Sequence, residues 1–332
     1  MMKQLPLLGA TLLTLFSASL HAGSGIASLT LDNDYFINRD DGYTNGLYFT
    51  LYDRSGIPAM ADDSTAPEHS VLVSPLMWSM PTERQYGSVN ALKFGQSMFT
   101  PADLTLTEPD PNDIPYSAML SLTNSYLVLN QDHADVVHST LGIVGPAALG
   151  KESQKLVHQV LGSDDPQGWG SQLHNELVFQ VGRGRIWRHW ASELDNMDLL
   201  TSLKGSVGTI RSAASSSLIV RYGRDLKRSF GSFLLLDSRT TNPVAVSGEW
   251  YVYAGLQAEY VFNEIFMDGN TFRDSASVNY DHSFIGLNFG VAYSWGRSSL
   301  TFAVNHSDLL QPSKDRYSDE TRYGTLTYAW QF

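Results

Sequence analysis

The chain has 332 residues, no cysteine and a formal net charge of −12 at pH 7. Without cysteine, an exported chain has neither a disulfide scaffold nor a thiolate metal site. The acidic balance argues against nucleic acid as a partner, because its phosphates require clustered Lys and Arg. It is compatible with a cation such as calcium bound among carboxylates. Aromatic residues make up 11% of the chain, and Tyr and Trp favour membrane interfaces.

Residues 1–22 are predicted to be a secretory signal peptide, and residues 23–332 to form the functional domain. Lys3 gives the start a positive charge, an apolar run follows over 5–20, and Ala22 is a small residue at the expected cleavage site. After Ala22 no run approaches the roughly 18 apolar residues that a spanning helix needs. A helical membrane protein is therefore not expected.

Alternation of apolar and polar residues divides the domain into a dozen candidate strands. They are 26–33, 43–53, 86–99, 116–130, 134–144, 172–186, 198–208, 213–222, 249–262, 282–295, 298–305 and 322–332. Many are about ten residues or longer, as tilted membrane strands are. The last alternates, is rich in aromatics and ends on Phe332, which resembles the recognition signal of bacterial outer-membrane proteins. We predict an all-β fold, a transmembrane antiparallel β-barrel of about twelve strands. A soluble all-β barrel or sandwich is the alternative.

An even number of strands puts both termini on the periplasmic side. The connections 34–42, 100–115, 145–171, 263–280 and 306–321 then lie on the outer side, and most inner connections are short. Two inner connections, 54–85 and 223–248, are long. Residues 71–80 in the first are apolar and aromatic, which is compatible with a further strand or a plug-like element.

One helix is predicted, over 151–162 in the outer connection 145–171. Its apolar residues, Leu156, Val157, Val160 and Leu161, share one face. We expect this stripe to cover the barrel wall or to dip into the membrane interface. Trp169, and Trp187 farther along the chain, are predicted to be interfacial anchors.

The tip of the first hairpin is unusually polar for a tight turn. Asn33 and Asp34 end the first strand, Asp40 and Asp41 precede the second, and Thr44 lies just inside it. Such a cluster favours a functional rim. Asp40 and Asp41 are more simply interpreted as solvated loop charges.

Several short motifs recur in the order found in one family of membrane enzymes. They are Asn33-Asp34, Gly42-Tyr-Thr-Asn-Gly46, Gly142-Ile-Val-Gly-Pro146, Gln154, His158, Gly168-Trp-Gly-Ser-Gln172 and the stretch 268–275. In this order they resemble the lipid A 3′-O-deacylase family of the bacterial outer membrane. The resemblance implies a twelve-stranded barrel and calcium-dependent hydrolysis of an ester-linked acyl chain at the 3′ position of lipid A. It places the site at the outer leaflet, between barrel wall and loop helix.

The resemblance also implies roles for individual residues. His158 matches the helix histidine proposed as general base, Asn33 and Asp34 match the opening site pair, and Thr44 matches the family's threonine. Gln154 and Asp164 are expected beside the substrate, Asp164 standing where a relative has Glu. The 100–115 connection has no basic residue, whereas that relative has adjacent Lys and Arg there. Arg39 or Arg273 is the candidate replacement for gripping lipid A phosphate.

The chemistry of these side chains is consistent with ester hydrolysis. Histidine, with an ordinary pKa of about 6.5, is suited to activating water. Calcium prefers oxygen ligands such as Asn33 and Asp34 offer and polarises a carbonyl. No Gly-x-Ser-x-Gly elbow indicates a serine nucleophile. His158 also has a structural interpretation, as a charge favoured near a helix C-terminus.

We therefore predict a monomeric enzyme of the outer membrane, acting on lipid A of lipopolysaccharide among outer-membrane lipids, with Ca²⁺ as cofactor. An outer-membrane phospholipase with the same chemistry is one alternative. A non-catalytic barrel, either a narrow pore or a structural protein, is the other.

Overall fold

The computed structural model describes residues 25–33, 42–55, 69–82, 87–161, 166–224, 226–235, 250–306 and 322–332. The predicted signal peptide and the tip of the first hairpin, including Asp34, Asp40 and Asp41, lie outside these ranges. Of the helices described, none is long and apolar enough to cross a membrane.

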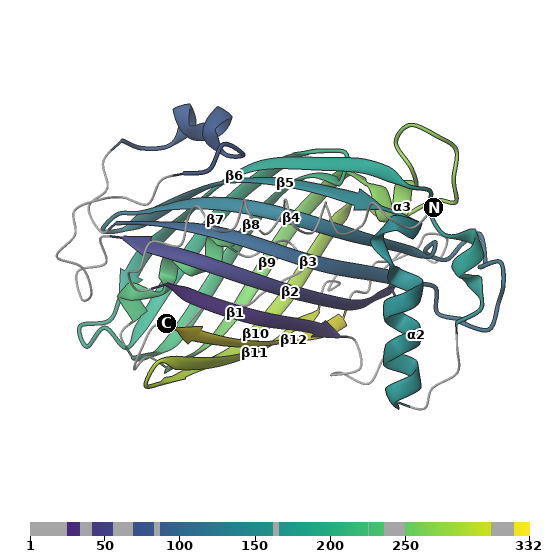
Figure 1. Ribbon diagram of the computed structural model, residues 1–332. Helices are drawn as coiled ribbons and strands as arrows, with labels where there is room; N and C mark the ends of the chain where they lie inside the picture. Colours follow the sequence, from purple (N-terminus) through teal and green to yellow (C-terminus); the bar gives the residue numbers. More distant parts are fainter. Residues whose placement is uncertain are drawn as a thin grey trace.

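Twelve antiparallel strands close into a barrel, in which each strand pairs with its neighbours in the sequence and β1 pairs with β12 (Figure 1). The strands are β1 (Ile26–Asn33), β2 (Gly42–Ser55), β3 (Ser88–Thr100), β4 (Ser117–Leu129), β5 (His133–Val144), β6 (Glu176–Ala191), β7 (Met197–Gly208), β8 (Arg211–Arg224), β9 (Trp250–Glu264), β10 (Ser283–Trp295), β11 (Ser298–His306) and β12 (Arg322–Gln331). The predicted fold class and strand number are confirmed. Closure leaves no sheet edge unpaired, which is the requirement for strands in lipid.

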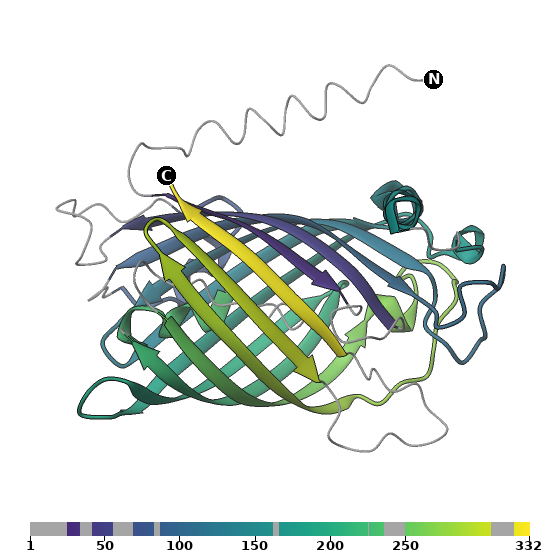
Figure 2. The same cartoon turned by 90° about the horizontal axis from the view of Figure 1, so that it is seen from below.

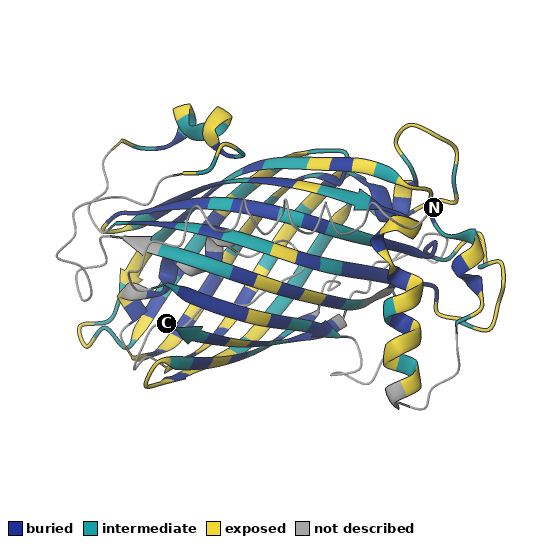
Figure 3. Cartoon of the chain, viewed as in Figure 1, coloured by how far each residue is buried: buried dark blue, intermediate teal, exposed yellow. Residues whose placement is uncertain are grey.

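The alternation of side chains separates an outward from an inward face. Leu29, 47% exposed, points outward from β1, whereas Thr30, 7% exposed, points into the lumen. There Thr30 hydrogen-bonds to Thr327 of β12 across 2.7 Å. Along the strands, exposed and buried bands alternate in the same way (Figure 3). Large apolar residues on the outside and small or polar ones inside are the pattern of a barrel in a membrane.

The two rims differ as predicted. The rim here called outer bears the connections 101–116, 145–175 and 265–282, whereas the inner rim has the short turns 130–132, 192–196 and 296–297. The β7–β8 connection, residues 209–210, is a short exception on the outer rim.

The long inner connection between β2 and β3 folds onto the outside of the barrel. Its described part contains the 3-10 helix η2 (Ser74–Ser79). Val73 and Met80 pack against Tyr126, Val128 and Val137, which face outward from β4 and β5. This element is therefore neither a strand nor a plug, and the strand number stays at twelve.

The other long inner connection enters the lumen. Its helices η5 (Leu226–Arg228) and η6 (Phe230–Leu235) bring Phe230 and Phe233 into a large cluster with inward residues of β3 to β11. Arg221 of β8, buried on all sides, donates from Nη2 to the Leu226 carbonyl at 2.7 Å and to Asp198 Oδ2 at 2.6 Å. The connection thus fills the inner end of the lumen.

A second apolar cluster fills the outer end of the lumen. The short helix α3 (Ile265–Asp268) follows β9 and turns Phe266 inward, where its ring stacks on Phe99 with centroids 4.0 Å apart. Leu173, Ile210 and other buried residues complete the cluster. Apolar side chains therefore occupy both ends of the barrel interior.

Candidate functional site on the outer wall

The predicted loop helix is present as α2 (Gly150–Leu161), preceded by the 3-10 turn η3 (Pro146–Ala148). It lies outside the barrel near the outer rim and contacts β3 and β4 (Figures 1 and 2). Gln96, which faces outward from β3, donates from Nε2 to the Ala148 carbonyl across 2.5 Å. The helix is therefore attached to the lipid-facing wall.

Gly150 allows the start of α2 to approach the wall closely. A β-carbon at this position would lie 2.4 Å from the β-carbon of Ala118 and 2.5 Å from the indole ring of Trp169. Carbon atoms in ordinary contact are about 3.5–4.0 Å apart. Any side chain at this position would push the helix away from the barrel or from the indole.

Trp169 lies beneath the helix and is not exposed at a membrane interface. It belongs to the 3-10 turn η4 (Gly168–Ser171), is 3% exposed and packs with Met98, Tyr116 and Ala118. Its Nε1 donates a 2.7 Å hydrogen bond to Gln154 Oε1, so the indole has the partner that a buried Trp requires. The prediction of Trp169 as an interfacial anchor is wrong, whereas Trp187 does face outward, from β6.

Gln154 is almost completely buried between the helix and the wall, at 2% exposure. While Oε1 accepts from Trp169, the buried Nε2 has no hydrogen-bond partner among the described residues. A buried amide N–H without a partner is costly. The described residues therefore leave one donor of the buried Gln154 amide unpaired.

The faces of α2 differ from those predicted. Leu156 and Val157 are 64% and 39% exposed, so these two residues of the stripe do not cover the barrel wall. The alternative, that the stripe dips into the membrane interface, stays a prediction. His158 is half-buried and follows Gln154 by four residues, which puts both on one face of the helix.

Asn33 belongs to the same stretch of outer wall as the start of α2. It pairs with Asn45 of β2, Asn45 pairs with Met98 of β3, and Met98 pairs with Ala118 of β4. The row formed by these four outward-facing residues ends beneath Gly150. Thr44 stands at a bulge in β2, between Tyr43 and Asn45; its side chain lies outside the described set.

Asp34, Arg39 and Asp164 also lie outside the described residues. Within the described ranges, no group of three or more His, Asp or Glu side chains has the arrangement to hold a metal ion. The predicted calcium ligand Asn33 offers an amide oxygen at the end of β1, a donor that suits calcium.

Arg273 is exposed in the loop that follows α3. The loop is fastened to the start of β6, because Asn270 Nδ2 and the Thr271 amide both donate to the Glu176 carboxylate, at 3.1 and 3.0 Å. Asn270 also accepts from the His174 amide at 2.8 Å. Arg273 therefore stands on the outer rim, beside the segment that leads away from α2.

Comparison with known proteins identifies the family. The sequence model described as outer membrane protein LpxR matches residues 7–332. The chain belongs to the LpxR family. This is the lipid A 3′-O-deacylase family that its motifs resemble, so the recognition from the sequence is confirmed. As a member of this family, the chain is a protein of the bacterial outer membrane.

One solved structure in particular shares this fold. LpxR from Salmonella typhimurium aligns with a TM-score of 0.70 and 17% identity, covering 92% of this chain and 100% of that one. A COG4313 outer membrane channel from Pseudomonas putida F1 is less similar, with a TM-score of 0.45 and 12% identity over 94% of this chain and 97% of that one. No match was found among curated proteins.

In this LpxR-family chain, sequence reasoning missed three contributors to the site. Gly150 and Trp169 set the position of the helix, and Asn45 continues the row that starts at Asn33. Asn45 and Trp169 were visible as members of the motifs. The sequence shows only that Gly150 precedes a helix. Its close contacts with Ala118 and Trp169 join residues of different elements and cannot be read from the sequence.

Proposed function

We propose that the protein hydrolyses the ester-linked acyl or acyloxyacyl chain at the 3′ position of lipid A in the outer leaflet. The observation that carries the proposal is the attachment of α2 to the outside of the barrel, with Gln154 and His158 on one helix face and Asn33 on the same wall. A site on the outer wall is reached laterally by a membrane lipid, without passage through the lumen.

In the proposed mechanism His158 is the general base. Its imidazole takes a proton from water, and the water oxygen attacks the ester carbonyl carbon. The tetrahedral intermediate then expels the sugar hydroxyl oxygen, which takes the proton back from His158. The products are a fatty acid and the free 3′ hydroxyl, and no acyl-enzyme forms.

Asn33 and Asp34 would hold the Ca²⁺ ion through oxygen ligands. A bound Ca²⁺ supplies positive charge beside the carbonyl oxygen, where negative charge develops. Gln154 Nε2 is the further donor on the helix side, and Thr44 and Asp164 complete the set by family resemblance. Arg39 and Arg273 are the proposed partners of lipid A phosphate.

The filled lumen weighs against a pore. Apolar side chains occupy its outer end around Phe99 and Phe266 and its inner end around Phe230 and Phe233. A conducting channel needs a continuous polar path, which such clusters interrupt. The phospholipase alternative uses the same residues and differs only in the lipid that is cleaved.

Mass spectrometry of lipid A from cells that express the protein tests the proposal, with His158→Ala beside the unmutated chain. His174→Ala, an exposed histidine of the same connection, is the matched control. We expect loss of one acyl or acyloxyacyl mass with the unmutated protein and the control, and an intact spectrum with His158→Ala. Release of lysophospholipid instead would favour the phospholipase.

The calcium proposal has its own experiment. Purified protein treated with chelator should lose deacylation, and added Ca²⁺ should restore it. Undiminished activity in chelator would remove the metal from the mechanism. Size-exclusion chromatography in detergent tests the proposed monomer.

A further inference from the structure

A basic pair faces outward from β6, away from the candidate active site. Arg183 and Arg185 alternate with Gly184 and with Ile186, which is buried in the lumen cluster. Their side chains are 32% and 40% exposed. Arg185 pairs in register with Asp135, two residues from the inner end of β5. On β6 itself, Arg185 is six residues from the inner end at Ala191, so this residue lies on the outward face in the inner half of the strand.

The two guanidinium groups share one carboxylate. Asp135 is fully buried; its Oδ1 accepts from Arg185 Nε at 2.8 Å and also from Arg183. His133 contributes a ring nitrogen 3.7 Å from the other oxygen. A second carboxylate, that of Asp132, contacts His133 at 2.7 Å and neither of the two arginines. Arg183 and Arg185 therefore share a single carboxylate partner.

The two arginines differ in their further hydrogen bonds. Arg183 donates to the carbonyls of Val136 and of Ser79, which belongs to η2, at 3.3 Å each. The terminal amino groups of Arg185, in contrast, donate no hydrogen bond to any residue that the structure describes. Its guanidinium lies 6.0 Å from the ring centroid of Trp187. Arg185 thus has donors to offer to a ligand at the membrane surface.

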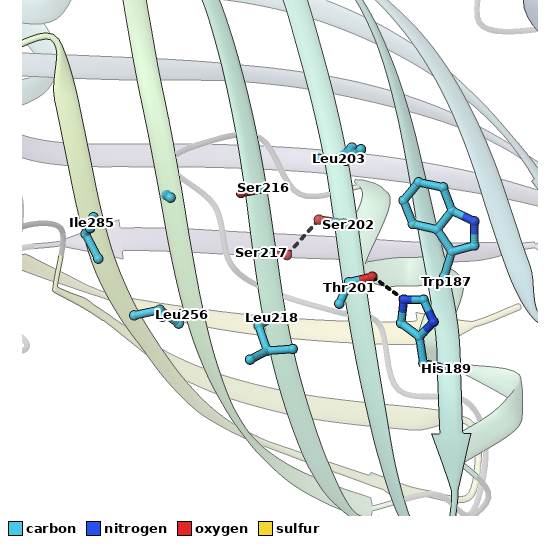
Figure 4. A pocket seen from close by; sticks show the side chains of 11 residues that line it. Trp187, His189, Thr201, Ser202, Leu203, Ser216, Ser217, Leu218, Leu256 and Ile285 are labelled. Carbon is cyan, nitrogen blue, oxygen red and sulfur yellow. Dashed lines mark hydrogen bonds between the residues drawn. The ribbon is translucent and has the colours of Figure 1, made fainter.

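A groove on the lipid-facing wall begins beside Arg185. Its volume is about 530 Å³, and Trp187 and His189, which follow Arg185 on β6, line one end (Figure 4). It follows one outward row of the sheet: Arg185 pairs with Leu203, which pairs with Ser216, and the row continues through Ala258 to Ile285.

Side-chain size forms the groove. Ser216 and Ala258 are small, whereas Leu218 and Leu256, two residues away on the same strands, are larger and 45% and 42% exposed. The lining is mainly apolar, and its length follows several strands. Such a groove fits an alkyl chain better than a compact polar ligand.

We propose that Arg185 and this groove bind one phospholipid of the periplasmic leaflet, with the phosphate on Arg185 and an acyl chain along Ser216 and Ala258. Charge complementarity argues for the phosphate, because guanidinium groups are its preferred partners. The apolar lining argues for the chain. The choice of leaflet rests on the proposed function, which places α2 at the outer leaflet and the inner rim in the periplasm.

Native mass spectrometry of the purified full chain in detergent tests this site, with dioleoyl phosphatidylglycerol as the probe and dioleoylglycerol as the lipid without phosphate. We expect one retained phosphatidylglycerol and little dioleoylglycerol. Arg185→Gln should weaken retention at least tenfold, whereas Arg185→Lys, which keeps the charge, should retain more. Arg297→Gln, an exposed arginine of the β10–β11 turn, is the control and should not differ from the unmutated chain.

The groove has a matched pair of variants on β9. Ala258→Phe should fill it and reduce retention at least tenfold, whereas Ala254→Phe, outward on the same strand but not lining the groove, should not. Equal retention by Arg185→Gln and Arg297→Gln, or equal retention of dioleoylglycerol, would overturn the proposal. The proposal would also be overturned if the purified chain formed a dimer without lipid and Ala258→Phe dissociated that dimer.

Deacylation of lipid A, measured on the same preparations, keeps the two proposals separate. These substitutions lie outside α2 and should leave deacylation in detergent unchanged. Lipid retention without deacylation would count against the proposed function alone. Deacylation without phospholipid retention would count against the lipid site alone.

Discussion

Replacing Gly150 by alanine is the most direct test of whether activity depends on the seating of α2. The added β-carbon would lie 2.4 Å from the β-carbon of Ala118 and 2.5 Å from the Trp169 ring. Carbon atoms need about 3.5 Å or more, so the helix or the indole must move by roughly 1 Å. Both neighbours are buried in the cluster under the helix, so little free space can absorb the change.

A displacement of about 1 Å in catalytic geometry costs on the order of a hundredfold in rate. We therefore expect Gly150→Ala to reduce lipid A deacylation by roughly that factor. The barrel should remain folded, because the contact is on the outer wall, away from the lumen clusters. Heat-modified migration on gels reports folding, and mass spectrometry of lipid A with purified protein reports the rate.

Gly170→Ala is the matched control, because a β-carbon there meets nothing within 4 Å although the residue lies beside Trp169. Its activity should equal that of the unmutated chain. A fully active Gly150→Ala would refute the dependence on helix position. Equal losses in both variants would show a general sensitivity of the loop and would refute the steric argument.

Three further predictions follow from other contacts. Trp169→Phe removes the 2.7 Å bond to Gln154; we expect α2 docking to weaken by about 1 kcal/mol, measured as faster amide exchange in the helix. Arg221→Met breaks a buried ion pair with Asp198 and should cost about 3 kcal/mol, seen as a lower Tm in detergent. Burial raises the pKa of Tyr280 above its ordinary value. The contribution of Tyr280 to the free energy of unfolding is therefore fully present below pH about 10, the pKa of tyrosine in the unfolded chain. It declines as pH rises above that value. Tyr280→Phe should remove that part of the alkaline loss of Tm.

The barrel was predictable because its pattern is local. Each membrane strand alternates along its own length, as Leu47, Phe49 and Leu51 do in β2, so the candidate strands could be recognised one at a time. Strand order then followed from closure by neighbouring antiparallel pairs. The predicted segments differ from the observed ones only at their ends, for example 213–222 against Arg211–Arg224.

The details of the helix were not predictable in the same way. Leu156 and Val157 look like a docking face, yet Gln154 is the residue that the wall encloses. In water an apolar stripe must be covered, but beside lipid it need not be, so helix amphipathicity alone does not fix orientation. Trp169 was misread for the related reason that its partner, Gln154, lies on a different element.

The first hairpin shows which features of the candidate site the sequence predicts and which it does not. Its acidic residues are conspicuous in the sequence. In the structure, however, the rim is connected to the helix by one outward row of uncharged residues, Asn45, Met98 and Ala118. In the proposed site, Asn33 forms one half and α2 completes it from outside the barrel. Because the lumen is filled at both ends, a ligand that reaches both halves approaches along the wall, through the membrane. The proposed substrate, an ester within a membrane lipid, meets that requirement, whereas a solute passing through the barrel would not.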